Sequence, residues 1–357
     1  MITVNKNNFL TAIKSVKTAT AKANLQPILS SIHLKTENGG LTLTATDCNN
    51  IARAVIETNN EIPINVCVMA DKLENIVSRL DEEIKVEVKD SNIIFKSGKT
   101  VFKCLFIQSS EFPNVDIQFS DDKVVLSKND FIAGVNKTAF ATAGEEIRNV
   151  ISNICFTFNN ENGYELAATD GNRLSRVCFN VPVNKDGKYI IPKNALISIA
   201  KTVKDEVEIY FTEKTVTFKT DNFVYVTQLF NGEFPPYSQL IPTKFEKIAT
   251  INRNELIKAL DKVSIMANDR TNITKFIFTE NNLQLITECP DGDAKDDIEI
   301  DYPYADEFNI AFNYLFILNG LKVMETENIT FNMNSSLSAV LIKGDYDYLV
   351  MPIQIKN

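Results

Sequence analysis

The sequence is poor in residues that bind metals or catalyse reactions. It contains one histidine, His33, and six cysteines, none of them in a CxxC pair. A zinc site needs closely spaced Cys and His ligands, so we expect no metal site. A single histidine also excludes Ser-His-Asp or Cys-His catalysis anywhere else in the chain. A chain of 357 residues does not need disulfides, so we expect buried free thiols at Cys48, Cys67, Cys104, Cys155, Cys178 and Cys289.

Long apolar segments and an excess of positive charge are also missing. No apolar run reaches about 18 residues, the length that a membrane-spanning helix needs. The first six residues, MITVNK, lack the apolar core of a secretory signal. We therefore expect a cytoplasmic protein. The net charge of −9, taken alone, argues against a nucleic-acid partner, although the distribution of charge matters more than its sum.

What the sequence does contain is a threefold internal repeat. One segment recurs near the start of each third, at 5–13 (NKNNFLTAI), 127–135 (SKNDFIAGV) and 252–260 (NRNELIKAL), with offsets of 122 and 125 residues. Each copy begins with an N-cap residue and continues with apolar residues at helical spacing. Ser127 and Asn252 are followed three positions later by an acid, as in a capping box. Each copy therefore predicts an amphipathic helix after a short strand.

Three further segments recur in the same order. Segments in which apolar and polar residues alternate, at 41–47, 164–170 and 283–287, each follow an Asn- or Gly-containing turn and are predicted strands. A strand and a short helix follow at 66–80, 189–203 and 308–321, with Leu73, Leu196 and Leu315 as equivalent residues. A closing strand and tail contain Glu-Phe-Pro at 111–113 and 233–235, and the third copy ends at 348–352 (YLVMP). Four patterns in one order at one period argue against chance similarity.

A period near 120 residues is a whole domain rather than a solenoid repeat. Each copy reads as strand, helix, several strands, helix and several strands. This order predicts an α+β fold in which two helices pack on antiparallel sheets. We expect three tandem domains, at residues 1–121, 122–246 and 247–357.

Basic residues are concentrated on the predicted helices. The segments 6–22, 71–80, 127–142, 192–204, 253–266 and 313–322 together contain 15 basic and 5 acidic residues. They carry a net charge of +10 inside a chain whose net charge is −9. Such a face would attract DNA phosphates without reading sequence. Any single lysine could equally belong to an ordinary solvated helix face.

Helix dimensions limit how such a face could enclose DNA. If helices about 10 Å wide line a hole side by side, six helices leave a hole about 10 Å in diameter, and twelve leave one of about 28 Å. A DNA duplex is about 20 Å across. One chain with this lining cannot encircle a duplex, and two chains can. Head-to-tail contacts between similar units can close such a ring.

Several short motifs then suggest a family. They are 168–174 (ATDGNRL), 232–235 (GEFP), Phe312-Asn313 before the last helix, and 350–352 (VMP). Together with the repeats, they make the whole sequence resemble the β subunit of bacterial DNA polymerase III, the replicative sliding clamp. This resemblance implies a homodimeric six-domain ring of DNA-clamp domains that encircles duplex DNA and is loaded by an ATP-driven clamp loader. It also implies a non-catalytic processivity factor, without a cofactor, that tethers the polymerase III α subunit and other clamp-binding-motif proteins.

The resemblance implies a peptide-binding groove between the second and third domains. Carried over by position, its residues are Ile151, Thr169, Gly171, Asn172, Arg173, Leu174, Pro235, Leu240, Phe316, Leu337, Leu349, Met351, Pro352 and Ile353. An apolar slot with a few polar anchors suits a short Gln/Leu/Phe-type peptide. Residues 169–172 alone could be a plain hairpin turn. Gln239 and the tail 354–357 (QIKN) depart from the family pattern, so peptide preference could differ.

Two more surfaces follow from the resemblance. The dimer contact would join Lys72, Phe102, Lys103 and Cys104 of one chain to Ile265, Met266, Asp293, Asp296 and Asp297 of the other. Asp71, where a relative carries Arg, makes the ion pairs at this contact less certain, and the acidic run 291–297 could also be a solvated loop. The expected DNA contacts are Lys14, Lys17, Lys22, Lys137, Arg148, Lys201, Lys258 and Lys262.

Two other functions compete with the clamp. One is a hydrolase or transferase that uses Asp47 and Asp170 as paired acids, which would have to lie within several ångströms of each other. These acids occupy equivalent turns of different repeats, which disfavours the idea. The other is a monomeric DNA-binding or scaffold protein without a closed ring, which sedimentation would distinguish from a dimer.

Overall fold

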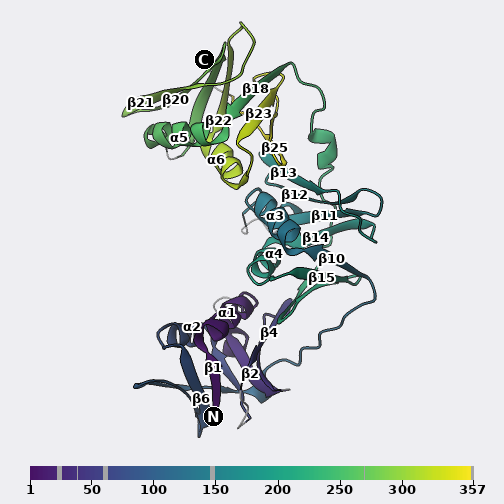
Figure 1. Ribbon diagram of the computed structural model, residues 1–357, viewed down its shortest axis with the longest axis vertical. Coiled ribbons are helices and arrows are strands. Elements are labelled where there is room, and N and C mark those ends of the chain that lie inside the picture. The colour runs from purple at the N-terminus through teal and green to yellow at the C-terminus, as the bar shows by residue number, and fades with distance from the viewer. Residues whose placement is uncertain (22–25, 38, 59–62, 145–148, 269, 355–357) are drawn as a thin grey trace. The chain divides into compact units, whose positions relative to one another are not determined.

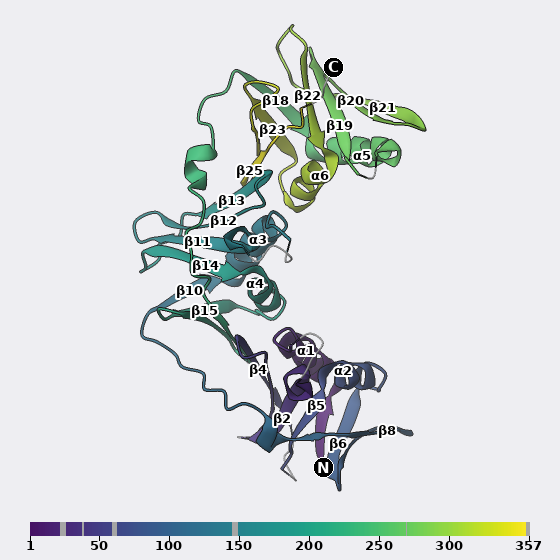
Figure 2. The same ribbon diagram turned by 180° about the vertical axis from the view of Figure 1, so that it is seen from behind.

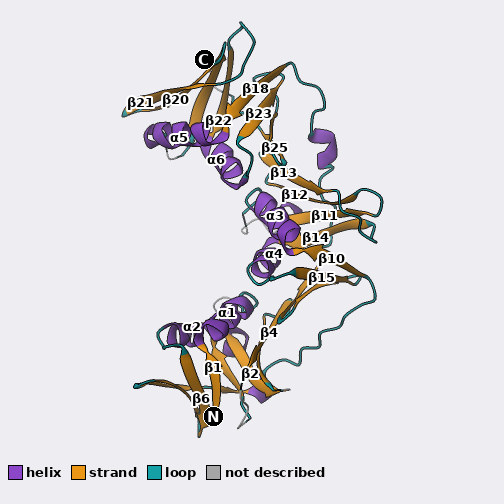
Figure 3. Ribbon diagram, in the orientation of Figure 1, coloured by secondary structure: helices purple, strands orange, loops and turns teal. Residues whose placement is uncertain are grey.

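The structure, a computed structural model, describes residues 1–357 except 22–25, 38, 59–62, 145–148, 269 and 355–357. Runs of strands separate single helices along the described residues (Figure 3), and the strand pairs among them are antiparallel. The chain forms two compact units. The first comprises Met1–Ile132 and Asn194–Leu229, and the second comprises Ala133–Lys193 and Phe230–Asn357.

The first unit contains two sheets. The smaller has the order β1 (Ile2–Asn5), β6 (Glu83–Lys89), β7 (Asn92–Ser97) and β8 (Thr100–Leu105). The larger has the order β10 (Lys123–Ser127), β15 (Glu206–Phe211), β16 (Thr215–Thr220), β17 (Phe223–Gln228), β4 (Asn50–Glu57), β3 (Gly40–Thr46), β2 (Ser31–Glu37), β5 (Asn65–Met69) and β9 (Ile107–Gln108). Strand β8 therefore ends its sheet.

Helices cover these sheets in the first unit. Helix α1 (Lys6–Lys17) lies beside α2 (Ala70–Ser78) and packs on β3 and β4 (Figures 1 and 2). Its buried face consists of Phe9, Ala12, Ile13 and Val16, at the helical spacing that the sequence shows. Helix α4 (Lys193–Ala200) belongs almost entirely to this unit, and α3 (Lys128–Ala139) begins in it.

The second unit has the same construction. Its larger sheet has the order β14 (Gly187–Pro192), β11 (Asn153–Asn159), β12 (Gly163–Thr169), β13 (Arg173–Phe179), β25 (Asp347–Val350), β24 (Val340–Lys343), β23 (Asn328–Met333) and β18 (Lys247–Asn252). Its smaller sheet has the order β21 (Gly292–Glu299), β20 (Asn282–Cys289), β19 (Ile273–Thr279) and β22 (Phe308–Asn313). Helix α5 (Arg253–Val263) lies beside α6 (Tyr314–Val323) and packs on β20 and β21.

The compact units do not follow the three sequence repeats, because each large sheet joins parts of two repeats. In the first unit β17 of the second repeat pairs with β4 of the first. In the second unit β13 of the second repeat pairs with β25 of the third. The second repeat is thereby shared between both units. The expected domain limits at 121 and 246 remain a prediction.

The local signals of the repeats are confirmed. The side chain of Asn5 accepts hydrogen bonds from Asn7 N and Asn8 N, and that of Asn252 accepts from Asn254 N and Glu255 N. The hydroxyl of Ser127 accepts from Asp130 N. The predicted turns contain left-handed backbone, with φ of +81° at Gly39, +92° at Gly163 and +56° at Asn281. At Gly163 an added Cβ would lie 2.1 Å from the Phe179 carbonyl oxygen, so only glycine fits.

One equivalence within the repeats is wrong. Leu73 and Leu196 are fully buried, but Leu315 is 39% exposed. Leu315 is the second residue of α6, whereas Leu73 and Leu196 are the fourth residues of their helices. The fully buried residue at the fourth position of α6 is Ile317. The offset of 119 residues taken from the preceding pattern misses this, because α6 begins 121 residues after α4.

The cysteines are free thiols, but only half of them are buried. Cys67, Cys104 and Cys155 are buried, Cys289 is half-buried, and Cys48 and Cys178 are exposed. Burial raises the pKa of the Cys67 thiol to about 12 and that of Cys155 to about 11. These two thiols therefore stay protonated and unreactive near neutral pH.

Candidate partner, DNA and dimer surfaces

All residues expected to bind a partner peptide lie in the second unit, around the junction of β13 and β25. Leu174 pairs with Leu349 across this junction, and both side chains are buried. They belong to an apolar cluster with Cys155, Ala167, Ile190, Phe234, Tyr237 and Leu341. The 3₁₀ segment η4 (Tyr237–Leu240) closes one side of it. The cluster thus joins parts of the second and third repeats through apolar packing.

The turn before β13 is held by its own side chains. The Thr169 hydroxyl donates to the Arg173 carbonyl oxygen at 2.7 Å and accepts from Gly171 N at 3.1 Å. The Asp170 carboxylate accepts from Asn172 N and Arg173 N. Gly171, at φ +91°, supplies the left-handed residue of the turn. Residues 169–172 are therefore a hairpin turn, and their part in a peptide-binding groove remains a prediction.

Arg173 is held in place from several directions. Its Nε donates to Asp170 Oδ2 at 2.9 Å, and its Nη2 donates to the Phe140 carbonyl oxygen at 2.8 Å. The guanidinium lies 4.5 Å from the ring centroid of Phe316 and 5.5 Å from that of Phe140. With its side chain only 9% exposed, Arg173 acts mainly as a support that positions the turn and Phe316.

Three exposed apolar side chains lie close in sequence to members of this cluster. Leu240 is 59% exposed, Leu337 63% and Met351 43%. Met351 N donates to the Asn172 carbonyl oxygen at 2.8 Å, so the backbone after β25 runs beside the turn. Ile353 N donates to the Ala311 carbonyl oxygen at 2.7 Å. The remaining expected residues, Ile151, Pro235, Pro352 and Ile353, are half-buried.

Sequence reasoning missed part of this region. Tyr237 is fully buried in the cluster, and Val150, Phe230, Ile241, Phe245 and Ala339 pack against it. The apolar run around the second Glu-Phe-Pro motif was the available signal. Tyr237 lies two residues after that motif, and Ile241 lies six after it.

Three expected DNA-binding lysines meet at one cleft of the first unit. A cleft of about 560 Å³ is lined by Lys14, Lys17 and Lys201, with Thr11, Ser15, Thr18, Glu74 and Ser198. Lys14 and Lys201 are exposed. Lys17 is paired with Asp71 at 2.5 Å and with Glu74 at 2.6 Å, and these bonds raise its pKa. Lys14 and Lys201 are therefore the two freely presented charges at this cleft.

The other expected DNA contacts are mixed. Lys258 and Lys262 are exposed on α5, and Lys262 pairs with Asp296 at 2.8 Å. Lys137 is only 8% exposed and pairs with Asp345 at 2.6 Å, so its ammonium is not available to a phosphate. We therefore leave Lys137 out of the DNA surface. Lys22 and Arg148 lie outside the described residues.

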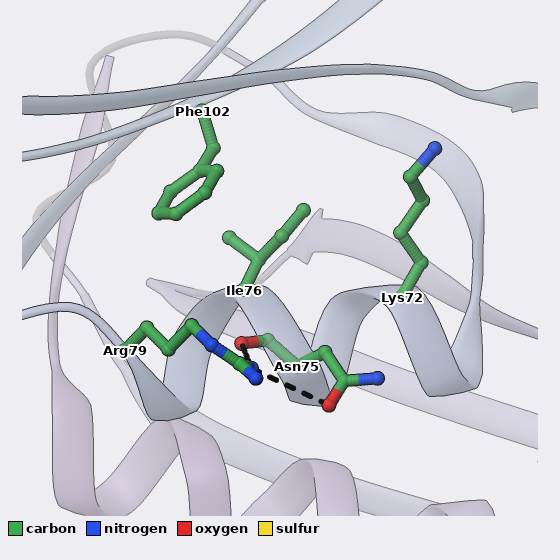
Figure 4. Close-up of a pocket in the computed structure, with 5 residues that line it drawn as sticks. All are labelled: Lys72, Asn75, Ile76, Arg79 and Phe102. Carbon is green, nitrogen blue, oxygen red and sulfur yellow. Dashed lines mark hydrogen bonds between the residues drawn. The ribbon is translucent and has the colours of Figure 1, made fainter.

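The expected dimer residues of the first repeat flank the edge strand β8. Lys72, Phe102, Asn75, Ile76 and Arg79 line a cleft of about 550 Å³. Figure 4 shows the Phe102 ring across from Ile76, with Lys72 and Arg79 at opposite ends of the cleft; Arg79 donates to the Asn75 carbonyl oxygen at 2.8 Å. Lys103 is exposed, whereas Cys104 is buried and faces the interior of its sheet.

The expected dimer residues of the third repeat lie on and near the edge strand β21. Ile265 is exposed, Met266 is half-buried, and Asp293 and Asp297 are exposed. Asp296 is engaged by Lys262, and Asp297 accepts hydrogen bonds from Asn282 and Gln284. All of the acidic run 291–297 except Asp291 lies in the edge strand β21, so the alternative of a solvated loop is wrong. Asp293 is the acid of this run with an exposed side chain near the start of β21.

The acids of the competing enzyme hypothesis serve local structure. Asp47 accepts hydrogen bonds from Asn49 N and Asn50 N, as Asp170 does in its own turn. Within the described residues, no group of three His, Cys, Asp or Glu side chains is placed to hold a metal ion. In the same part of the chain, no helix is long and apolar enough to cross a membrane.

Three α+β repeats joined edge to edge, with basic helices, define a protein of the DNA-clamp class. Three family models match in succession: the N-terminal domain of the DNA polymerase III β subunit at residues 1–116, the central domain at 125–236 and the C-terminal domain at 238–355. The chain belongs to the DNA polymerase III β subunit family, the bacterial sliding clamps. It is thus a non-catalytic processivity factor of DNA replication, which acts with DNA and polymerase.

Individual relatives agree with this assignment. The chain is 27% identical to the β sliding clamp of Synechococcus elongatus, covering 99% of this chain and 98% of the relative. The crystal structure of the β subunit from Thermotoga maritima matches with a TM-score of 0.92 and 25% identity over 99% of both chains. A sliding clamp from Bartonella birtlesii, solved bound to griselimycin, matches with a TM-score of 0.90 and 27% identity over 99% of both chains.

Proposed function

We propose that two copies of this chain close head to tail into a ring around duplex DNA, by pairing β8 of one copy with β21 of the other. The same junction already occurs twice within the chain, as β17 with β4 and as β25 with β13. By repeat position, β8 corresponds to β17 and β25, and β21 corresponds to β4 and β13. Both β8 and β21 end their sheets. A second copy is needed to supply the third kind of junction.

The two junctions inside the chain predict the strand register of the junction between β8 of one copy and β21 of the other. They place Val226 opposite Ile51, and Leu349 opposite Leu174. The residue of β8 equivalent to Val226 and Leu349 is Lys103, because Phe95 faces Phe102 as Phe218 faces Tyr225. The residue of β21 equivalent to Ile51 and Leu174 is Asp293. We therefore infer that Lys103 of one copy lies opposite the partner's Asp293.

This register distinguishes the dimer junction chemically from the internal ones. An apolar pair occupies the equivalent position at each internal junction, whereas an ion pair would occupy it between subunits. Exposed ion pairs contribute about 1 kcal/mol or less and weaken with salt. The joint between chains would thus be the one that opens, as loading onto closed DNA requires.

Disulfide cross-linking tests this register. Opposite residues of antiparallel strands have Cα atoms about 4.5–5.5 Å apart, within the range of about 4.4–6.8 Å that a disulfide spans. We expect the double variant Lys103→Cys, Asp293→Cys to form covalent dimers and closed rings under mild oxidation, with that bond found by peptide mapping.

The matched control shifts one cysteine along the same strand. In Lys103→Cys, Glu299→Cys the second cysteine lies six residues from position 293, so we expect little cross-linking. Equal cross-linking of both variants, or a monomer at micromolar concentration in sedimentation, would refute the proposed closure. The unsubstituted chain, oxidised in parallel, accounts for Cys104 and Cys289.

Within such a ring, the basic helices would face the duplex. The support is the cleft that gathers Lys14, Lys17 and Lys201, together with exposed Lys258 and Lys262. The intrachain pairs of Lys17 and Lys262 involve partly exposed side chains and are weak enough for phosphates to compete. Binding of this kind is independent of DNA sequence and sensitive to salt.

Partner proteins would bind at the surface around β13 and β25. Its exposed Leu240, Leu337 and Met351 border a buried apolar cluster, which suits a short peptide with apolar anchors. We assign to it the polymerase III α subunit and other proteins with a clamp-binding motif. Loading by an ATP-driven clamp loader and a cytoplasmic location complete the proposal.

A further inference from the structure

The first repeat contains a cleft at a position where, in the second repeat, side chains fill the space. The cleft has a volume of about 410 Å³. It lies on one face of β2, β3 and β4, under the tail that follows β9. It is lined by His33, Lys35, Glu37, Thr42, Thr44, Arg53, Ser109, Phe112, Pro113, Asn114 and Val115. All of these residues belong to the first unit.

The repeat identifies what occupies the same place in the second copy. His33 faces Thr44 as Cys155 faces Ala167, and Arg53 faces Thr44 as Arg176 faces Ala167. The two Glu-Phe-Pro motifs are 122 residues apart, so Val115 corresponds to Tyr237. The tail of the first repeat therefore carries a small side chain where the second carries an aromatic ring.

In the second repeat this ring fills the space. Tyr237 is fully buried, and its hydroxyl donates to Glu165 Oε1 at 2.5 Å and lies 3.2 Å from the Thr157 hydroxyl. Its ring packs edge-on against Phe234 at 5.8 Å. In the first repeat Phe112 replaces Phe234 and packs against His33, with ring centroids 5.0 Å apart and the ring planes tilted by 35°. Among the described residues that line the cleft, Val115 stands at the position of Tyr237 and offers no ring.

The arginines differ in the same way. Arg176 Nη2 donates to Asp347 Oδ2 at 2.6 Å, from the strand opposite it. Arg53 instead faces Val224, which offers no carboxylate. Arg53 Nη2 donates to the Val115 carbonyl oxygen at 3.4 Å. The buried Nε has no hydrogen-bond partner in either arginine, so the two differ in the carboxylate that Asp347 supplies to Arg176. Arg53 is half-buried, and a partly desolvated guanidinium gains from a charged hydrogen bond, so an incoming anion would stabilise it.

The other charged groups leave this arginine available. Lys35 is paired with Glu37 at 2.6 Å, and this bond lowers the pKa of Glu37. His33 is bonded to Asn65 at 2.7 Å, and burial lowers its pKa, so it is neutral near pH 7. Arg53 also contributes, more weakly than Lys35, to the lowered pKa of Glu37, but the ion pair of Glu37 is with Lys35. The cleft thus offers a guanidinium beside the rings of His33 and Phe112. The second repeat shows which groups complete such a site: an aromatic ring and a carboxylate.

We propose that this cleft binds an exposed segment of a partner protein that supplies an aromatic side chain next to a carboxylate. The ring would occupy the space that Tyr237 fills in the second repeat, against His33 and Phe112. The carboxylate would pair with Arg53 as Asp347 pairs with Arg176. This site is separate from the surface around β13 and β25 and does not depend on it.

The test compares two probes that differ only in charge. They are acetyl-Asp-Tyr-amide and acetyl-Asn-Tyr-amide, titrated into the full-length protein with NMR shifts of the His33 ring as the readout. Small ligands of this size bind with Kd on the order of a millimolar. We expect the Asp probe to shift the His33 signals and to bind at least about tenfold more tightly than the Asn probe, because charged hydrogen bonds are the strong ones.

Two variants locate the binding. Val115→Tyr should fill the cleft as in the second repeat and abolish binding with Arg53 still present. Arg53→Gln should remove the preference for the Asp probe, and an unchanged thermal midpoint would show that the variant is folded. Equal binding of the two probes, no binding of either, or unaltered binding by Val115→Tyr would overturn the proposal.

Discussion

At the scale of single residues, the candidate peptide surface separates supporting side chains from exposed ones. Leu174, Leu349 and Arg173 are held in the interior, whereas Leu240, Leu337 and Met351 are exposed. Replacing a buried residue of this region would perturb the fold as well as binding. Exposed residues therefore give the cleaner test of function.

We expect the double variant Met351→Ala, Leu240→Ala to weaken binding of a clamp-binding peptide at least about tenfold, because truncating anchor residues at a binding hot spot costs about 2 kcal/mol or more. The dimer should be unaffected. Fluorescence anisotropy of a labelled peptide measures the change. Leu315→Ala, which truncates a leucine of α6 that is also partly exposed, serves as the matched control. Unchanged affinity of the double variant would show that the surface is misplaced.

Arg173 is expected to act through structure. Arg173→Ala leaves Asp170 without its cation and Phe316 without the guanidinium, and loss of one partner of a buried ion pair costs about 3 kcal/mol or more. Denaturant unfolding of the second unit should report this loss. Arg173→Lys should recover part of it, because the charge remains while the bond to Phe140 is lost. If Arg173→Ala were as stable as the parent, the supporting role would be wrong.

At the scale of the elements, charged side chains hold neighbouring strands together. Glu208 on β15 pairs with Lys219 on β16 at 2.6 Å and with Lys123 on β10 at 3.0 Å. These two bonds, first that from Lys219 and then that from Lys123, lower the pKa of Glu208 to about 2. One carboxylate thus connects three strands.

A lowered carboxylate pKa gives stability that is present above its unfolded pKa and is lost on acidification. For Glu208 this loss runs from about pH 4.5 down to about pH 2. Since the group is partly exposed, the effect is modest. We expect urea midpoints measured at pH 5 and pH 3 to fall further apart in the parent than in Glu208→Gln. An identical pH dependence would contradict the three-strand role of this carboxylate.

The elements also show what a sequence can reveal about this fold. Caps at Asn5 and Asn252 and the turn at Gly163 were predictable, because their hydrogen bonds and backbone angles involve residues close in the chain. The ion pair that occupies Lys137 was not predictable, because its partner Asp345 belongs to the third repeat. A lysine on a helix looks available for DNA until a distant segment neutralises it.

The candidate surfaces follow the same rule. The turn at 169–173 and the tail at 349–353 could be found from short motifs. Their contact through the β13–β25 junction, and the burial of Tyr237 between them, required the register of strands far apart in the chain. The edge positions of β8 and β21 likewise depend on the whole strand order.

At the level of the whole molecule, the proposed function requires two copies of the chain to close into a ring. Three repeats provide two junctions inside the chain and leave one strand at each end of the series, so a second copy completes the set. A closed ring holds DNA by topology, and its lysines need only weak, nonspecific contacts. Retention should then depend on the ends of the DNA rather than on affinity.

Retention on DNA after loading tests this claim most directly. The clamp is loaded onto a nicked circular duplex with its clamp loader, the circle is linearised with a restriction enzyme, and gel filtration measures the protein that remains bound. We predict that the clamp stays on the circle and is lost from the linear molecule, unless bulky proteins block both ends. Equal retention on circular and linear DNA would contradict the account, because it would mean that the lysines hold the duplex by ordinary electrostatic binding.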